Sequence, residues 1–98
     1  MTRKAPTDCV SMAELRPQID SIDNELIELL FIRSRYIDRA VDLKRIENLP
    51  ARTTDRVAEV FGNVRKMASE RGLDPQLAET LWHELIEWSI AREAKHLG

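Results

Sequence analysis

The chain has 98 residues, of which 43% are hydrophobic and 33% are charged, a size and composition that fit one small domain. Its 15 basic and 17 acidic residues give a formal net charge of −2 at pH 7, so no positive surplus exists to hold a nucleic acid. With one cysteine, Cys9, the chain has neither an internal disulfide nor a zinc-type ligand set, and we expect no metal site.

The start of the chain is polar and does not resemble a secretory signal. The longest apolar run covers residues 29–32, far short of the roughly 20 residues that cross a bilayer. A lone cysteine also suits a reducing compartment. We therefore expect a cytoplasmic protein with no membrane partner, in which a polar leader over residues 1–10 precedes one helical domain over residues 11–98.

A long first helix is predicted from about Ser11 to Ile46. Ser11 and Glu14 have the spacing of a capping box, although Pro17 weakens the first turns, and Pro50 stops the helix. Apolar residues recur along it at steps of four and three, at Leu15, Ile19, Ile22, Leu26, Leu29, Tyr36, Ala40 and Leu43.

Two shorter helices follow. The first begins among the capping residues 53–55 and ends at Gly72, a typical C-terminal cap. The next has Asp74 as its cap and Pro75 at its first helical position, and it continues to near Leu97. No segment alternates with a period of two, so the predicted fold class is all-α with three helices per chain.

The length of the first helix predicts a second copy of the chain. About 35 helical residues span roughly 50 Å, whereas a compact domain of this size has a radius of gyration of about 13 Å. In a monomer the apolar seam of this helix would be exposed to water. We therefore expect a homodimer with paired long helices and an isologous interface.

A cation interrupts the apolar seam at Arg33, and Lys44 lies three helical turns further along the same face. With Cα atoms about 16 Å apart, the two long side chains have the reach to hold both ends of a small anionic ligand. The alternative is that their charged ends extend to solvent or pair with acids such as Asp23 or Asp38.

Arg16 lies about 25 Å from Arg33 along the helix axis and reaches the same ligand only from an antiparallel partner. The alternative is a solvated arginine.

Beyond the first helix, Arg52, Thr53 and Arg56 surround a helix start whose free N–H groups suit a carboxylate. Ordinary capping with surface charge is the alternative there.

Ser89 and Glu93 are polar residues on an otherwise apolar stripe of the third helix. They are candidates for ligand contact, and the alternative is a frayed end with Glu93 exposed. No glycine-rich phosphate loop or nucleophile elbow occurs, which disfavours the enzymes that need them.

Taken together, these segments resemble the all-α chorismate mutase family over residues 15–93. The joint spacing of Arg16, Arg33, Lys44 and Arg56 is the most specific part of the resemblance. Residues 86–91, together with Asp8-Cys9, are similar to the isochorismate-pyruvate lyase branch, which uses the same small fold. The segments that carry the likeness are residues 15–23 and 28–30, followed by Arg33, Lys44, Arg52 and Arg56.

The resemblance implies an intertwined helical homodimer with two equivalent sites. Arg33 would bind one substrate carboxylate, the partner's Arg16 the other, and Lys44 the ether oxygen. Lys44, Glu93 and Arg33 would be the catalytic residues. The other substrate-binding residues would be Arg56 near the carboxylate, Thr53 on the loop side, Val57 beside it and Ser89 near a carboxylate.

The implied reaction is the rearrangement of chorismate to prephenate in aromatic amino-acid biosynthesis, an isomerisation that requires no nucleophile, metal or cofactor. Three alternatives stay open: an isochorismate-pyruvate lyase that yields salicylate, a mutase of an amino analogue of chorismate, and a helical dimerisation module without activity.

Two positions depart from the family pattern. Glu93 stands where many members have glutamine, and a carboxyl group donates to the ether oxygen only when it is protonated, so we expect higher activity at acidic pH. Val57 stands where several mutases have a glutamate that contacts the ring hydroxyl. Without that contact to the ring hydroxyl, selection between chorismate and isochorismate would be relaxed, which would favour the lyase.

Overall fold

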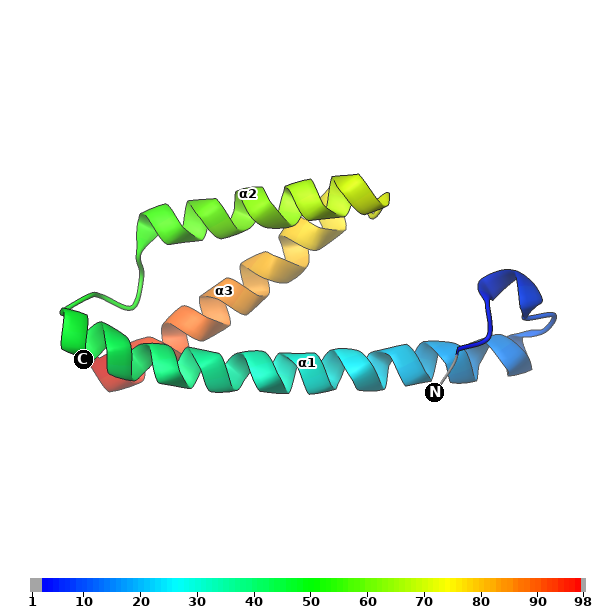
Figure 1. Cartoon of the computed structure of the whole chain (residues 1–98), viewed down its shortest axis with the longest axis horizontal. Helices are drawn as coiled ribbons and strands as arrows, with labels where there is room; N and C mark the ends of the chain where they lie inside the picture. Colours follow the sequence, from blue (N-terminus) through cyan, green and yellow to red (C-terminus); the bar gives the residue numbers. More distant parts are fainter. Residues whose placement is uncertain (1–2, 98) are drawn as a thin grey trace. The chain divides into compact units, whose positions relative to one another are not determined.

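The computed structural model describes residues 3–97; residues 1, 2 and 98, which belong to the expected leader and domain, lie outside the described part. Three α-helices follow one short 3₁₀ helix, η1 (Pro6–Asp8). They are α1 (Met12–Glu47), α2 (Thr54–Arg71) and α3 (Pro75–Leu97) (Figure 1). Residues 3–97 contain no strand, which confirms the predicted all-α class with a long first helix.

The chain divides into two compact units, Met1–Arg35 and Tyr36–Gly98, and α1 contributes residues to both. In the first unit the predicted capping box is confirmed. The Glu14 N–H donates to Ser11 Oγ at 3.2 Å, and the Glu14 carboxylate accepts from the Val10 N–H at 3.1 Å. Pro17 lies inside α1 without ending it, because a proline removes only one backbone donor and the capped turn before it is already formed.

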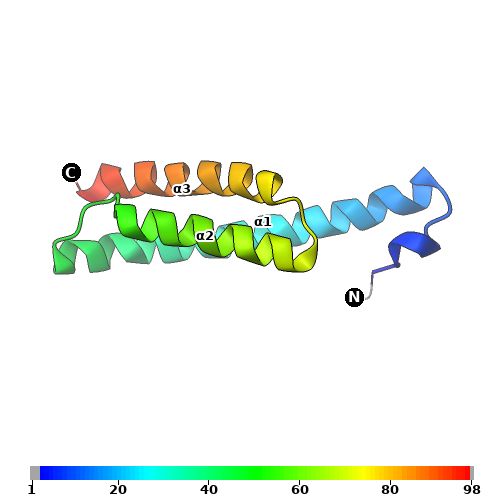
Figure 2. The ribbon, with the colours of Figure 1, turned by 90° about the horizontal axis from the view of Figure 1, so that it is seen from above.

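Residues 3–10 turn back beside the first turns of α1 (Figure 2). The Lys4 N–H donates to Gln18 Oε1 at 3.0 Å, and the Lys4 ammonium lies 2.5 Å from Glu14 Oε1. Arg3 pairs with Glu25 at 2.7 Å. The hydrogen bond from Lys4 lowers the pKa of Glu14. Polar contacts therefore connect this segment to α1.

In the second unit, α1 ends at Glu47 and the chain turns at Asn48, whose φ is 58°. The next N–H, that of Leu49, donates to the Lys44 carbonyl at 2.8 Å and satisfies one of the last helical acceptors. Pro50 follows and prevents the helix from continuing. The loop that leads to α2 therefore begins directly after the turn of α1 that carries Lys44.

The reversal between α2 and α3 has the predicted residues at both caps. Gly72 has φ 74° and donates to the Ser69 carbonyl, and the next N–H, that of Leu73, donates to Ala68 at 2.9 Å. At the start of α3 the Asp74 carboxylate accepts from the Gln76 N–H at 2.9 Å. The two helices consequently run in opposite directions, in contact near the turn, and α3 slants away from α2 beyond it (Figure 1).

The buried core of the second unit lies mainly between α2 and α3, the helix pair whose backbones approach most closely. Small side chains at their contact permit this approach. Val41 of α1 and Ile86 of α3 are also buried. The core cluster consists of Val64, Ala68 and Ala78, with Val60 and Trp82 packed against it.

Large apolar side chains along α1 remain exposed within one chain, as the length of the helix predicts. In the first unit Leu26 is 52% exposed and Leu29 is 62% exposed; in the second unit Tyr36 is 73% exposed. None of the described helices is both long and apolar enough to span a membrane. The predicted apolar seam of α1 is thus exposed in the single chain.

Two glycines, Gly62 inside α2 and Gly72 at its C-cap, give a matched test of the cap. We expect Gly72→Ala to lower the free energy of unfolding by about 1 kcal/mol, because alanine is strained at positive φ. Gly62→Ala, inside α2 with open space around the added methyl group, should instead raise it by about 0.5 to 1 kcal/mol. Urea unfolding of both variants measures the difference, and equal effects would contradict the assigned cap.

Candidate active site

A buried ion pair between α1 and α3 forms the centre of the candidate site. The Lys44 ammonium lies 2.7 Å from Glu93 Oε1, and the two side chains are only 17% and 5% exposed. The same ammonium donates to the carbonyl oxygen of Ala51 at 2.7 Å. Because an ammonium group has three N–H donors and the contact with Ala51 is the well-aligned hydrogen bond among these two, the ammonium keeps a donor for a ligand.

The Glu93 side chain is even more buried than that of Lys44. Glu93 and Ser89, one helical turn earlier, are buried polar residues of α3, and the Ser89 hydroxyl donates to the Leu85 carbonyl at 2.8 Å. Glu93 Oε1 is buried and accepts no well-aligned hydrogen bond in the described structure, so its contact with Lys44 is mainly electrostatic. The alternative of a frayed helix end with an exposed Glu93 is therefore wrong.

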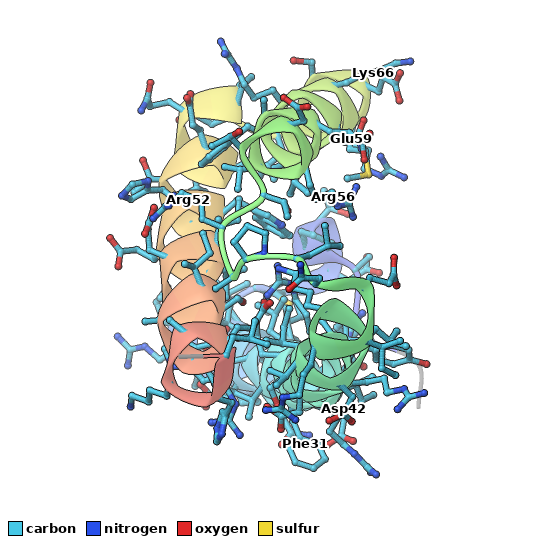
Figure 3. The ribbon with its side chains drawn as sticks, turned by 90° about the vertical axis from the view of Figure 1, so that its left-hand side faces the viewer. Phe31, Asp42, Arg52, Arg56, Glu59 and Lys66 are labelled. Carbon is cyan, nitrogen blue, oxygen red and sulfur yellow. The ribbon has the colours of Figure 1, made fainter. Side chains whose placement is uncertain are left out.

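The loop before α2 is attached at two points. The Ala51 carbonyl accepts from Lys44, and the next residue, Arg52, pairs with Glu87 of α3 at 2.7 Å. Figure 3 shows Arg52 on the side of the loop that faces α3. The hydrogen bond from Arg52 holds the pKa of Glu87 below its usual value. The loop backbone is thus positioned over the Lys44 ammonium.

The remaining predicted residues of the second unit lie at the start of α2. Thr53 is the half-buried N-cap, although its side chain makes no capping hydrogen bond, and Val57 is also half-buried. Arg56 is exposed and pairs with Glu59 on its own helix, as Figure 3 shows. The structure therefore unites Lys44 and Glu93 but leaves Arg56 with a surface partner.

Arg16 and Arg33 belong to the α1 segment of the first compact unit. Arg16 is exposed and Arg33 is half-buried. The roles of both toward substrate carboxylates stay predictions.

A second ion pair connects α1 to α3 at the surface. Arg92 donates to the Asp38 carboxylate through Nε at 2.5 Å and Nη2 at 3.0 Å, and its guanidinium lies 5.3 Å from the centre of the Trp88 ring. The hydrogen bond from Arg92 lowers the pKa of Asp38. Asp38 is thus the partner of Arg92, whereas the acid that pairs with Lys44 is Glu93.

The sequence gives no sign of three of these contacts. A backbone carbonyl such as that of Ala51 has no residue-type signal, because every residue has one. The pairs Arg52–Glu87 and Arg92–Asp38 join residues 35 and 54 positions apart. Periodicity within one helix does not indicate which residue of another helix lies opposite.

A family model described as chorismate mutase type II matches residues 15–94 of the chain. The chain is 35% identical over 94 residues to an isochorismate pyruvate lyase of Pseudomonas aeruginosa, an alignment that covers 95% of this chain and 91% of that protein. It is 26% identical over 86 residues to a chorismate mutase of Methanocaldococcus jannaschii, covering 88% of this chain and 87% of the other. A bifunctional chorismate mutase/prephenate dehydratase of Aquifex aeolicus is 32% identical over 87 residues, which cover 86% of this chain and 24% of that protein.

The burial of the Lys44–Glu93 pair predicts a large effect on stability. Lys44→Met leaves the Glu93 carboxylate buried without its cation, so we expect it to lower the free energy of unfolding by about 3 kcal/mol. Adding Glu93→Gln to this variant should recover much of the loss, because the unpaired charge is then removed.

Arg65→Met is the matched control for urea unfolding of these variants. It removes one partner of an exposed ion pair with Glu79, and we expect a change of less than about 1 kcal/mol. If Lys44→Met costs no more than this control, the Lys44–Glu93 contact is not the buried pair described above.

Proposed function

Because the chain belongs to the chorismate mutase type II family, we propose that it catalyses the intramolecular rearrangement of chorismate to prephenate. The observation that carries the proposal is the buried Lys44 ammonium, which the Ala51 carbonyl and Glu93 hold within the segment that the family model matches. A fixed, enclosed cation is the group that this reaction needs where negative charge develops.

The rearrangement is concerted, so the protein has to fix one conformation of the substrate and stabilise the charge of its transition state. As the ether bond breaks, negative charge grows on the ether oxygen. The remaining N–H donor of Lys44 is assigned to that oxygen, because its ammonium is already fixed by Ala51 and Glu93. Such a preorganised donor needs no reorientation during the reaction, and burial strengthens its effect.

The other cations are assigned to the two substrate carboxylates. In this proposal Arg33 binds one carboxylate, the partner's Arg16 binds the other, and Arg56 exchanges its surface partner Glu59 for a supporting contact. Four residues complete the proposed pocket: Thr53 at the loop, Val57 beside the ring, and Ser89 and Glu93 on α3.

A homodimer is part of the same proposal. Its support is the series of large apolar side chains that one chain leaves exposed along α1, including Leu26, Leu29 and Tyr36. A second copy that covers this seam would remove apolar area from water. It would also supply the arginine that each site takes from the other chain, so the dimer and the site depend on each other.

A second candidate function is an isochorismate-pyruvate lyase. It is favoured by the 35% identity to a protein of that name over 95% of this chain. Val57 adds physical support, because an apolar side chain makes no hydrogen bond to a ring hydroxyl, whose position distinguishes chorismate from isochorismate. Both candidates use the same cations on closely related dicarboxylates.

We place the proposed reaction in aromatic amino-acid biosynthesis, in the cytoplasm. The matched relative from Aquifex aeolicus joins a chorismate mutase to a prephenate dehydratase, which fits the first point. The single cysteine of the chain suits a reducing compartment and supports the second.

A paired assay with chorismate and with isochorismate tests the reaction. We expect prephenate from chorismate, and Lys44→Ala should lower kcat/KM by about 100- to 1,000-fold, as the loss of one preorganised donor does. Lys66→Ala, on the exposed face of α2, is the control and should leave the rate unchanged. Salicylate and pyruvate as the main products would instead assign the lyase, and turnover of neither substrate would refute both candidates.

Complementation between two inactive variants tests the shared site. Arg16→Ala and Lys44→Ala should each be inactive alone. A mixture refolded in equal amounts should recover about a quarter of the parental activity, because half of the dimers are mixed and each of these has one intact site. Sedimentation velocity should give twice the 11.3 kDa mass of the chain. No recovery from mixed dimers would contradict a site shared between chains.

A further inference from the structure

Two consecutive residues of α3, Arg92 and Glu93, form ion pairs with α1. In the first pair α3 supplies the cation, and in the second it supplies the anion. Arg92 is the cation of the surface pair with Asp38, whereas Glu93 is the anion of the buried pair with Lys44. Successive residues of a helix point about 100° apart, so the two side chains reach α1 on different sides of the contact between the helices.

This arrangement of charges defines one register of α3 on α1. If α3 turned by one residue, Arg92 would approach the Lys44 ammonium and Glu93 would leave it. Like charges at such distances repel each other, and they do so more strongly where the site is shielded from water. Because Arg92 and Glu93 have opposite charges, the placement in which α3 is turned by one residue relative to α1 is unfavourable.

The register depends on side chains because the backbones of α1 and α3 do not pack closely. Among the described helices, α2 and α3 are the pair in extensive backbone contact. Long polar side chains span the distance between α1 and α3, and a third contact joins Arg45 to the carbonyl of His96 at 2.8 Å. The packed core holds α3 on α2, whereas the placement of α3 relative to α1 is set mainly by these polar contacts.

Arg92 is well suited to fix the register. Its guanidinium forms two hydrogen bonds with one carboxylate, a geometry that restricts direction as well as distance. Trp88, one turn earlier in α3, lies against the same guanidinium. Both partners of the ion pair are about half exposed, so the pair contributes little to overall stability.

We propose that Arg92 is a positioning residue of the Lys44–Glu93 site, acting through Asp38 and Trp88 to hold α3 in the register that sets Glu93 against Lys44. The inference rests on the proposed function for its effect on catalysis. Arg92 itself is assigned no contact with the substrate. Its effect on rate should therefore exceed its effect on stability.

The test compares Arg92→Gln and Asp38→Asn with Arg65→Gln, which breaks another exposed ion pair, that of Arg65 with Glu79 between α2 and α3. With chorismate as substrate we expect the first two variants to lose about tenfold or more in kcat, since small displacements of catalytic groups are costly. KM should change by less than about twofold, because the assigned carboxylate ligands are untouched. Their melting temperatures should stay within about 2 °C of that of Arg65→Gln.

The exchanged pair provides the rescue. In the double variant Asp38→Arg, Arg92→Asp the ion pair forms with reversed polarity, and kcat should return to within about threefold of the parental value. The double variant Asp38→Asn, Arg92→Gln should be no slower than either single variant. Additive losses, no rescue, or a loss of kcat that matches the loss of stability would overturn the proposal.

One measurement is independent of turnover. In NMR spectra of the full chain, the carboxyl carbon of Glu93, identified by its disappearance in Glu93→Gln, should shift in Arg92→Gln and stay unchanged in Arg65→Gln. Equal spectra for Arg92→Gln and the parent would overturn the positioning role even if the enzyme is active. If the parental chain converts neither chorismate nor isochorismate, the proposed function fails, and the resonance alone decides the role of Arg92.

Discussion

The buried contact between Lys44 and Glu93 is the constraint on which the rest of the site depends. A lone charge in this place would be strongly unfavourable, so each residue requires the other, and α1 and α3 must meet where the two coincide. The Ala51 carbonyl adds a second acceptor for the ammonium and brings the loop to the same point. Three segments of the chain are thereby joined at one cation.

Several local features make this meeting possible. Asn48 and Pro50 end α1 within one turn of Lys44, and Gly72 reverses the chain so that α3 starts in contact with the end of α2. The small side chains between α2 and α3 let those helices pack closely. The approach of α3 to α1 relies instead on ion pairs, of which Arg92–Asp38 is the exposed one. Apolar packing therefore holds α2 against α3, and ion pairs hold α3 against α1.

The chemistry that the site supports follows from what it contains. A fixed ammonium, together with the arginines that we propose as carboxylate ligands, suits a reaction in which a dianionic substrate is held in one conformation and negative charge moves onto an oxygen. The matched relatives are named for two kinds of enzyme, a chorismate mutase and an isochorismate pyruvate lyase. Because both substrates are closely related dicarboxylates, the choice between them depends on contacts to the ring hydroxyl. In the proposed pocket Val57 lies beside the ring and makes no such hydrogen bond.

The sequence by itself determined the helices, their caps and the exposed seam of α1. The spacing of apolar residues, the Ser11–Glu14 box and Gly72 act within a few residues of one another, so local rules suffice to predict them. The sequence also singled out Lys44 and Glu93, which the family resemblance assigned to one site, but it gave no contact between the two side chains. Only the tertiary structure decided that they form one buried pair, and that Arg92 binds Asp38, because contacts between residues far apart in the chain depend on how the helices pack.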